Sequence, residues 1–222
     1  MSFQSLNLDF TQPHTIQPSD NEWTPSHAPG VERQRLERES EESGWTTSIV
    51  RYAPNSFFPT HGHPGGEEFL VLEGTFSDQT GDFPTLTYVR NPMGSSHKPF
   101  TLKGCRIFVK LCQMEPSEQG QTVVRPEDSH WEPGAQTGQK VKRLFENRHE
   151  RVRMAAWQPG TRASTTPTEG RREVLILNGT WQYQGMDLEP ETWIRIPKGD
   201  TGELVCLSGG QIWTKQFLSE GN

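Results

Sequence analysis

The strongest constraint on the fold of this chain is that its sequence repeats. Residues 68–76 read EFLVLEGTF, and residues 173–181, 105 positions later, read EVLILNGTW. Pro92 and Gly94 have counterparts at the same spacing. Near the front of the repeat the spacing is 108. The change from 108 to 105 is explained if the second copy is three residues shorter at the charged turn over 37–44. A period of this length corresponds to a whole domain rather than to a solenoid unit.

The repeat predicts two all-β domains. The 21 glycines and 17 prolines indicate many tight turns, and no long stretch shows the 3.6-residue period of an amphipathic helix. We expect an N-terminal arm over 1–20, a first domain over 21–115, a linker over 116–129 and a second domain over 130–222. Strands are predicted at 31–36, 45–52, 69–72, 86–89 and 105–111, with an edge strand at 6–10, a charged turn at 37–44 and a polar loop at 77–84.

The candidate site of the first domain is a group of histidines with one glutamate. His61 and His63 are two residues apart, so on a strand they point to the same side. A Pro-Gly-Gly turn follows, and we expect it to form a hairpin that brings Glu67 near both imidazoles. His97 lies downstream in a second turn. Three imidazoles and a carboxylate are ligands typical of a transition-metal site.

These residues carry a resemblance to a known superfamily. The order His-x-His-(x)3-Glu-(x)6-Gly followed by Pro-x-Gly-x-x-His is the two-part signature of the cupins. The longer run GHPGGEEFLVLEGTF…YVRNPMGSSHKPFTLKGCRIFVKL resembles the cupin domain of ChrR, a zinc-binding anti-sigma factor. Thr101 departs from the pattern, since many cupins carry Asn there, but this position is not a ligand.

The resemblance implies a bicupin, that is, two tandem cupin (double-stranded β-helix, or jelly-roll) barrels. It also implies that His61, His63, Glu67 and His97 bind one divalent metal, with zinc expected and a sensory or regulatory role in a stress response. ChrR-type factors grip the sigma factor with a separate helical domain that carries a His-x-x-x-Cys-x-x-Cys motif. This sequence has no such motif, so we expect no direct, tight binding to a sigma factor.

The second copy has lost the metal-binding residues. His61 is replaced by Thr166, His63 by Thr168, Glu67 by Arg172 and His97 by Gly202. We therefore expect one metal per chain, and an anion or polar molecule near Arg172 if the second barrel binds anything. Glu68 persists as Glu173, and its strand parity points it away from the histidines. We interpret it as a residue of the fold.

Composition excludes several function classes. The net charge of −6 argues against a nucleic-acid groove or an anionic-membrane surface. No apolar run approaches the roughly 20 residues needed to cross a bilayer, and the first residues do not resemble a signal peptide. Three cysteines without a Cys-x-x-Cys pair are typical of a reduced, cytoplasmic protein. A homodimer is left open.

Two function classes remain open. Four ligands in a closed tetrahedron would suit structural or sensory zinc, whereas six-coordinate Fe(II), Mn(II) or Ni(II) would leave positions open for a small-molecule enzyme, such as a cupin dioxygenase acting on a dicarbonyl compound. No catalytic acid or base is assigned. Four further candidates are not placed relative to the metal: Tyr52, Tyr88, Arg51 and Arg106.

Overall fold

The computed structural model describes residues 5–40, 44–164 and 170–218, and it divides into two compact units. The first unit comprises residues 1–8 and 22–128, and the second comprises 9–21 and 129–222. Each is an all-β unit, as the sequence predicted, and the described residues contain one short helix, the 3-10 helix Pro18–Asp20. No helix in this part of the chain has the length and apolar character needed to span a bilayer.

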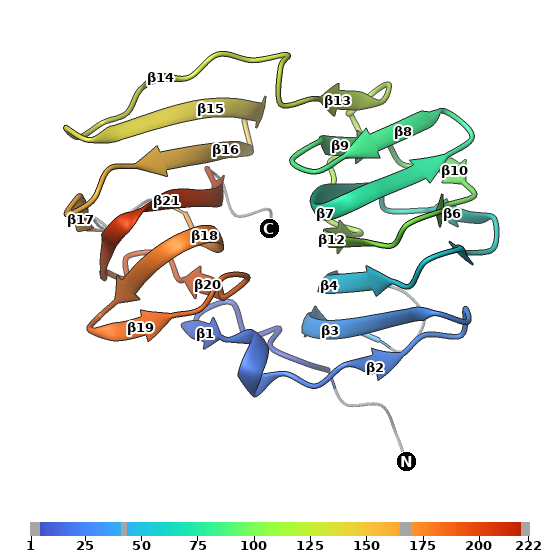
Figure 1. The fold of residues 1–222 in the computed structure, drawn as a ribbon, viewed down its shortest axis with the longest axis horizontal. Helices are drawn as coiled ribbons and strands as arrows, with labels where there is room; N and C mark the ends of the chain where they lie inside the picture. Colours follow the sequence, from blue (N-terminus) through green and yellow to red (C-terminus); the bar gives the residue numbers. More distant parts are fainter. Residues whose placement is uncertain (1–4, 41–43, 165–169, 219–222) are drawn as a thin grey trace. The chain divides into compact units, whose positions relative to one another are not determined.

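The first unit is built on a ten-stranded sheet in the order β13-β9-β7-β12-β4-β3-β2, with β5, β8 and β11 attached beside this path. The strands β6 and β10 form a separate two-stranded ribbon (Figure 1). The bounds of these strands are β2 Thr24–Pro25, β3 Val31–Arg38, β4 Thr46–Tyr52, β5 Ser56–Phe57, β6 His61–His63, β7 Glu67–Asp78, β8 Gly81–Pro84, β9 Tyr88–Asn91, β10 Ser95–His97, β11 Phe100–Thr101, β12 Cys105–Leu111 and β13 Thr122–Val124.

The second unit repeats this scheme in a sheet ordered β1-β20-β18-β21-β16-β15-β14, with β17 on β21 and β19 on β18. Its long strand β18 corresponds to β7 at the spacing of 105 residues, and β15 corresponds to β3 at the spacing of 108. The bounds are β1 His14–Ile16, β14 Glu132–Pro133, β15 Gln139–Glu146, β16 Glu150–Trp157, β17 Arg162–Ser164, β18 Arg172–Tyr183, β19 Met186–Leu188, β20 Trp193–Ile196 and β21 Glu203–Phe217.

One edge strand of each sheet comes from a segment that is distant in sequence from the rest of that sheet or belongs to the connection between the repeats. In the second unit β1 pairs with β20, placing His14 opposite Arg195 (Figure 1). In the first unit β13 pairs with β9, placing Thr122 opposite Arg90. These registers match residue for residue, since β13 follows β1 by 108 positions and β20 follows β9 by 105. The arm of each sequence repeat therefore completes the sheet of the other repeat's unit.

Several local predictions differ from the structure. The arm strand lies at 14–16 rather than at 6–10, where Leu6 makes only an isolated bridge to Arg38. The predicted polar loop over 77–84 is a hairpin of β7 and β8, because Asp78 pairs with Gly81 across a two-residue turn. The predicted linker contains β13. Strand β3 runs to Arg38, past the predicted end at 36.

Each unit has its own apolar core, made by residues that share one face of its strands. In the first unit the rings of Phe69, Phe76 and Phe83 pack together, with centroids 4.8 to 6.4 Å apart. In the second unit Trp157 and Trp181 lie at the centre, with centroids 5.2 Å apart. Burial of large rings of this kind stabilises each unit independently of any metal.

Candidate metal centre

The three histidines are placed by the β6–β10 ribbon. His61 lies directly opposite His97 in this antiparallel pair, and His63 lies opposite Ser95. Side chains two residues apart share a face, so the three imidazoles project to one side of the ribbon. The predicted hairpin between the histidine strand and the following strand was wrong, because β6 pairs with β10 and β7 joins the large sheet.

The turn between β6 and β7 nevertheless places Glu67 close to the three imidazoles. The Gly66 N–H donates to the His63 carbonyl at 3.2 Å, which closes the turn over residues 64–66. Gly66 has a φ of +76°, and a Cβ there would collide with Met114, so glycine suits this position on both counts. Glu67 is the first residue of β7 and enters the same space as the imidazoles.

The four ligand candidates converge. One ligand atom from each of His61, His63, Glu67 and His97 lies within 4.8 Å of all the others. The Glu67 carboxylate is 3.6 Å from Nε2 of both His63 and His97. His63, Glu67 and His97 are buried, with 3 to 4% of their surface exposed, and His61 is half-buried. Among the described residues, these four make the one group with the composition and spacing of a metal site.

Hydrogen bonds on the far side of each imidazole orient its ring. Nδ1 of His61 donates to the Pro59 carbonyl at 2.9 Å, and Nδ1 of His97 donates to the Asp78 carboxylate at 3.1 Å. Nδ1 of His63 lies 3.1 Å from the Ser95 hydroxyl. In His61 and His97 the acceptor places the proton on Nδ1, so Nε2 presents a lone pair, as metal binding through Nε2 requires.

Two buried atoms at the centre are left without partners. Nε2 of His63 and Nε2 of His97 have no hydrogen-bond partner among the residues that the structure describes. A buried polar atom without a partner costs about 1–3 kcal/mol. The Glu67 carboxylate is held by the Asn91 amide at 2.9 Å, which in turn accepts from Gln121 at 2.8 Å. The residues present therefore fit a bound cation.

The electrostatic surroundings distinguish the three imidazoles. Burial lowers the pKa of His61 and of His63. Burial also opposes protonation of His97, but its hydrogen bond to Asp78 and the negative charge of Glu67 outweigh this effect and raise the His97 pKa. The Asp78 pKa is lowered, because hydrogen bonds from His97 and Thr80 outweigh its burial.

A cavity of about 360 Å³ in the first unit reaches the four ligands. Its apolar wall is formed by residues of the barrel interior, namely Val50, Phe58, Phe76, Ile107 and Val109. Two polar side chains that could contact a ligand there are Arg33 and Tyr52. The four candidate ligands therefore lie beside a space large enough for a small molecule.

Sequence reasoning missed several residues of this site. Asp78 was placed in a polar loop, and Arg33 was placed on the strand at 31–36 without a role in the site, although both face inward. For Arg33 a usable signal existed, because it lies two residues after Val31, which belongs to the core. No sequence signal distinguishes Asp78 from an exposed turn residue.

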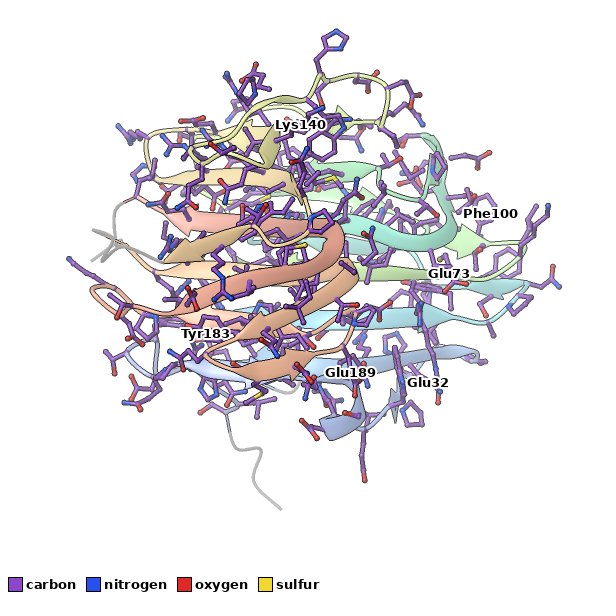
Figure 2. All side chains as sticks on the ribbon, turned by 60° about the vertical axis from the view of Figure 1, so that its left-hand side comes forward. Glu32, Glu73, Phe100, Lys140, Tyr183 and Glu189 are labelled. Carbon is purple, nitrogen blue, oxygen red and sulfur yellow. The ribbon has the colours of Figure 1, made fainter. Side chains whose placement is uncertain are left out.

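Of the four further candidates, only Tyr52 lines the cavity. Arg51 forms an ion pair with Glu32 at 2.6 Å, and Arg106 forms one with Glu73 at 2.7 Å. Both pairs are partly exposed, and Figure 2 labels Glu32 and Glu73 on the first unit.

The fourth candidate, Tyr88, belongs to a buried network on the other strand face. Its hydroxyl donates to Glu68 at 2.7 Å, and Arg90 forms ion pairs with Glu68 and Glu118. Glu68 thus points away from the histidines, as its parity predicted, and holds neighbouring strands together. The counterpart Glu173 accepts from the Trp193 indole N–H at 3.2 Å in the second unit.

In the second unit another side chain occupies the space beside Gly202, the residue that corresponds to His97. A Cβ at Gly202 would overlap the ring of Tyr183, which follows Asp78 by 105 residues. Arg172 is partly buried, and burial lowers its pKa. Thr166 and Thr168 lie outside the described residues.

The fold and the site together define a two-barrel protein with a candidate metal centre in its first barrel. The family model of the ChrR cupin-like domain matches residues 11–115 and again residues 119–216, so the chain belongs to that family. No curated protein matches the sequence.

Solved structures show the same bicupin fold. YlbA from E. coli is 12% identical with a TM-score of 0.77, covering 98% of this chain and 96% of that one. The bacterial pirin YhhW from E. coli in complex with nickel(II) is 11% identical with a TM-score of 0.65, covering 92% and 98%. The oxalate decarboxylase of Lactobacillus farciminis in a formate complex is 10% identical with a TM-score of 0.66, covering 92% and 86%.

Proposed function

We propose that the first unit holds one divalent metal ion at His61, His63, Glu67 and His97 and uses it to bind a small oxygen-bearing molecule in the adjoining cavity. The observation that carries this proposal is the pair of buried, unpaired Nε2 atoms of His63 and His97, facing Glu67 beside the 360 Å³ cavity. A bound divalent ion would supply a Lewis acid able to polarise an oxygen of the ligand.

The surrounding residues have separate tasks in this proposal. Pro59, Ser95 and Asp78 fix the orientation of the imidazoles, and Asn91 fixes that of the Glu67 carboxylate. The apolar wall excludes water from the ligand's carbon atoms and strengthens polar contacts within the cavity. Zinc is our proposed metal because of the ChrR resemblance, while the nickel(II) bound by pirin and the general preferences of imidazole keep iron, manganese and nickel as alternatives.

Metal analysis tests the site directly. Protein purified without chelators and without a nickel column should contain one zinc ion per chain, and the His63→Ala variant should contain almost none. His130→Ala, which removes an exposed histidine outside the site, is the matched control and should keep the metal. A His63→Ala protein with full metal content would contradict the assignment.

The regulatory interpretation adds a second proposal about partners. We propose that the metal-bound unit senses a small molecule in a stress response and does not itself grip a sigma factor. A pull-down with the host's extracytoplasmic-function sigma factors should recover none of them. A stable stoichiometric complex would overturn this part of the proposal and leave the metal site untouched.

A second candidate function is catalysis at the same centre, for example by a dioxygenase. The cavity favours it, because ligand residues that adjoin open space leave room for substrate beside the ion. An oxalate decarboxylase among the structural matches shows that this fold serves an enzyme in that protein. Oxygen consumption by iron-loaded protein with small dicarbonyl compounds, absent in His97→Ala, would support the enzyme. Binding without turnover would support the sensor.

A further inference from the structure

Arg33 is a cation that lines the cavity and forms no salt bridge with a described residue. It lies on β3 opposite Val50 of β4, it is half-buried, and it lines the cavity that reaches the metal ligands. Its guanidinium lies 5.5 Å from the centre of the Phe58 ring. Within the described ranges it has neither a hydrogen-bond acceptor nor a carboxylate partner. A guanidinium removed from water normally has such a partner, since its desolvation is costly.

Tyr52 presents a second unused donor to the same space. It lies on β4 opposite Val31, so Tyr52 and Arg33 are diagonal neighbours on one face of adjacent strands. Only 8% of Tyr52 is exposed, and its ring packs edge-on against Phe76. Its hydroxyl has no hydrogen-bond partner in the part of the chain that the structure describes. Burial, reinforced by the charge of Glu67, raises the Tyr52 pKa, so the hydroxyl keeps its proton.

The Glu67 carboxylate of the cavity acts on Arg33 through its charge but forms no salt bridge with it. Glu67 is the one carboxylate among the described residues that line the cavity, and it faces His63 and His97 at 3.6 Å. The other lining arginine, Arg38, donates from Nε to the Ser40 carbonyl at 2.6 Å. A metal ion would add further positive charge, so the loaded cavity would carry an excess of positive charge that an anion would offset.

The second unit provides an internal comparison. Arg33 corresponds to Val141 at the spacing of 108, and Tyr52 corresponds to Trp157 at the spacing of 105. Both replacements are apolar, and both belong to the packed interior of that unit. The two donors are thus present in the unit that has the candidate metal ligands. They are absent from the second unit, where Arg172 and Gly202 replace Glu67 and His97.

Resting on the proposed metal-dependent function, we infer that the ligand is a small carboxylate, held by Arg33 and Tyr52 while another of its oxygens faces the metal centre. The planar guanidinium can donate two parallel hydrogen bonds to a carboxylate, which a neutral carbonyl cannot accept in the same way. The Tyr52 hydroxyl can donate a third. Short α-keto acids combine a carboxylate with a neighbouring oxygen and are therefore the probes of choice.

Calorimetric titration of zinc-loaded protein with pyruvate, α-ketobutyrate and α-ketoglutarate, each paired with its uncharged methyl ester, tests the inference. The acids should bind the natural protein more tightly than the esters. Arg33→Gln should weaken binding of the acids by about tenfold to hundredfold, the loss expected for a charge-assisted hydrogen bond, and should leave ester binding unchanged. Tyr52→Phe should have a smaller effect in the same direction.

Arg51→Gln is the matched control, because it removes a neighbouring arginine that is paired with Glu32 at the surface. It should bind the acids as the natural protein does. Arg33→Lys keeps the positive charge but loses the two parallel N–H donors of the guanidinium, so this variant should bind the acids with intermediate affinity. Metal content measured after each titration separates the two proposals. Zinc retained with no preference for acids over esters, or Arg33→Gln binding the acids normally, would overturn the carboxylate inference alone; natural protein that contains no metal would overturn the proposed function first.

Discussion

The two units share a strand order and a register but differ in what fills their interiors. The first unit places three imidazoles, the Glu67 carboxylate, Arg33 and Tyr52 around a cavity. The second unit places Trp157, Trp181 and Ile196 at the counterpart positions of Tyr52, Phe76 and Asn91. Since each unit forms its own large sheet with the corresponding strand order, this scaffold does not depend on the candidate metal ligands. The candidate ligands occupy a fold that apolar burial and strand pairing already stabilise.

The pair Asp78–His97 shows how the two interiors differ in detail. In the first unit these side chains are joined by a hydrogen bond of 3.1 Å. In the second unit Tyr183 and Gly202 take their places, and the tyrosine ring occupies the space over the glycine. The larger Tyr183 fills the space that the absence of a side chain at Gly202 leaves. Close packing is therefore kept, although the imidazole and the carboxylate are absent.

The largest expected effect comes from replacing His97 by glycine, the residue that the second unit has at the corresponding position, Gly202. In His97→Gly the metal loses one of its buried ligands, and metal content measured by elemental analysis should fall from one per chain to nearly none. Far-UV circular dichroism should remain that of the natural protein, because the strands are paired independently of the ligands. Normal metal content in this variant would show that the two units differ for another reason.

Acidification should remove the metal from the first unit and narrow the difference in stability between loaded and metal-free protein. Protons compete for the imidazole nitrogens, and His97, whose pKa is raised by Asp78 and Glu67 against the effect of burial, should be protonated first as pH falls. A raised folded-state pKa means that protonated His97 stabilises the metal-free fold below its ordinary pKa, and that this contribution is lost as pH rises through the folded pKa. Melting temperatures of loaded and metal-free protein between neutral and acid pH would test this; a difference independent of pH would contradict it.

Asp78→Asn should weaken metal binding without abolishing it. The amide can still accept from His97, but it carries no charge to stabilise the ring, and loss of such an outer partner lowers metal affinity by about tenfold to hundredfold. Competition with a chromophoric zinc chelator measures the change. Asp82→Asn, which alters the hydrogen bond from Ser77 in the same hairpin, is the control and should keep the natural affinity.

The smallest effect should come from Gly202→Ala in the second unit. The added methyl group would collide with Tyr183, and overpacking of this kind costs about 1–3 kcal/mol of folding stability. The double variant with Tyr183→Ala should be less destabilised than the sum of the two single changes, because the collision is removed. Denaturant unfolding measures both, and additive effects would show that the two positions do not interact.

The sequence was informative where residue type and spacing carry the information. The repeat predicted two similar barrels, and the resemblance predicted four candidate ligands whose side chains the structure brings together. Pairing across long separations was not predictable, because the Pro-Gly-Gly turn is compatible both with a hairpin and with the observed passage from β6 to β7. Asp78 and Arg33 were missed for a related reason, since an isolated charge on a strand does not reveal whether it faces solvent or a cavity.

The exchange of arms between the two repeats has a consequence for how the chain folds and how it arose. The β1–β20 pairing joins residues 14–16 to residues 193–195, so it closes a very long loop and should form late, after the rest of the second sheet exists. A single repeat standing alone would leave its arm unpaired and its sheet edge bare, whereas two identical copies could complete each other by exchange. The present chain has the strand pattern expected of two such copies joined into one polypeptide.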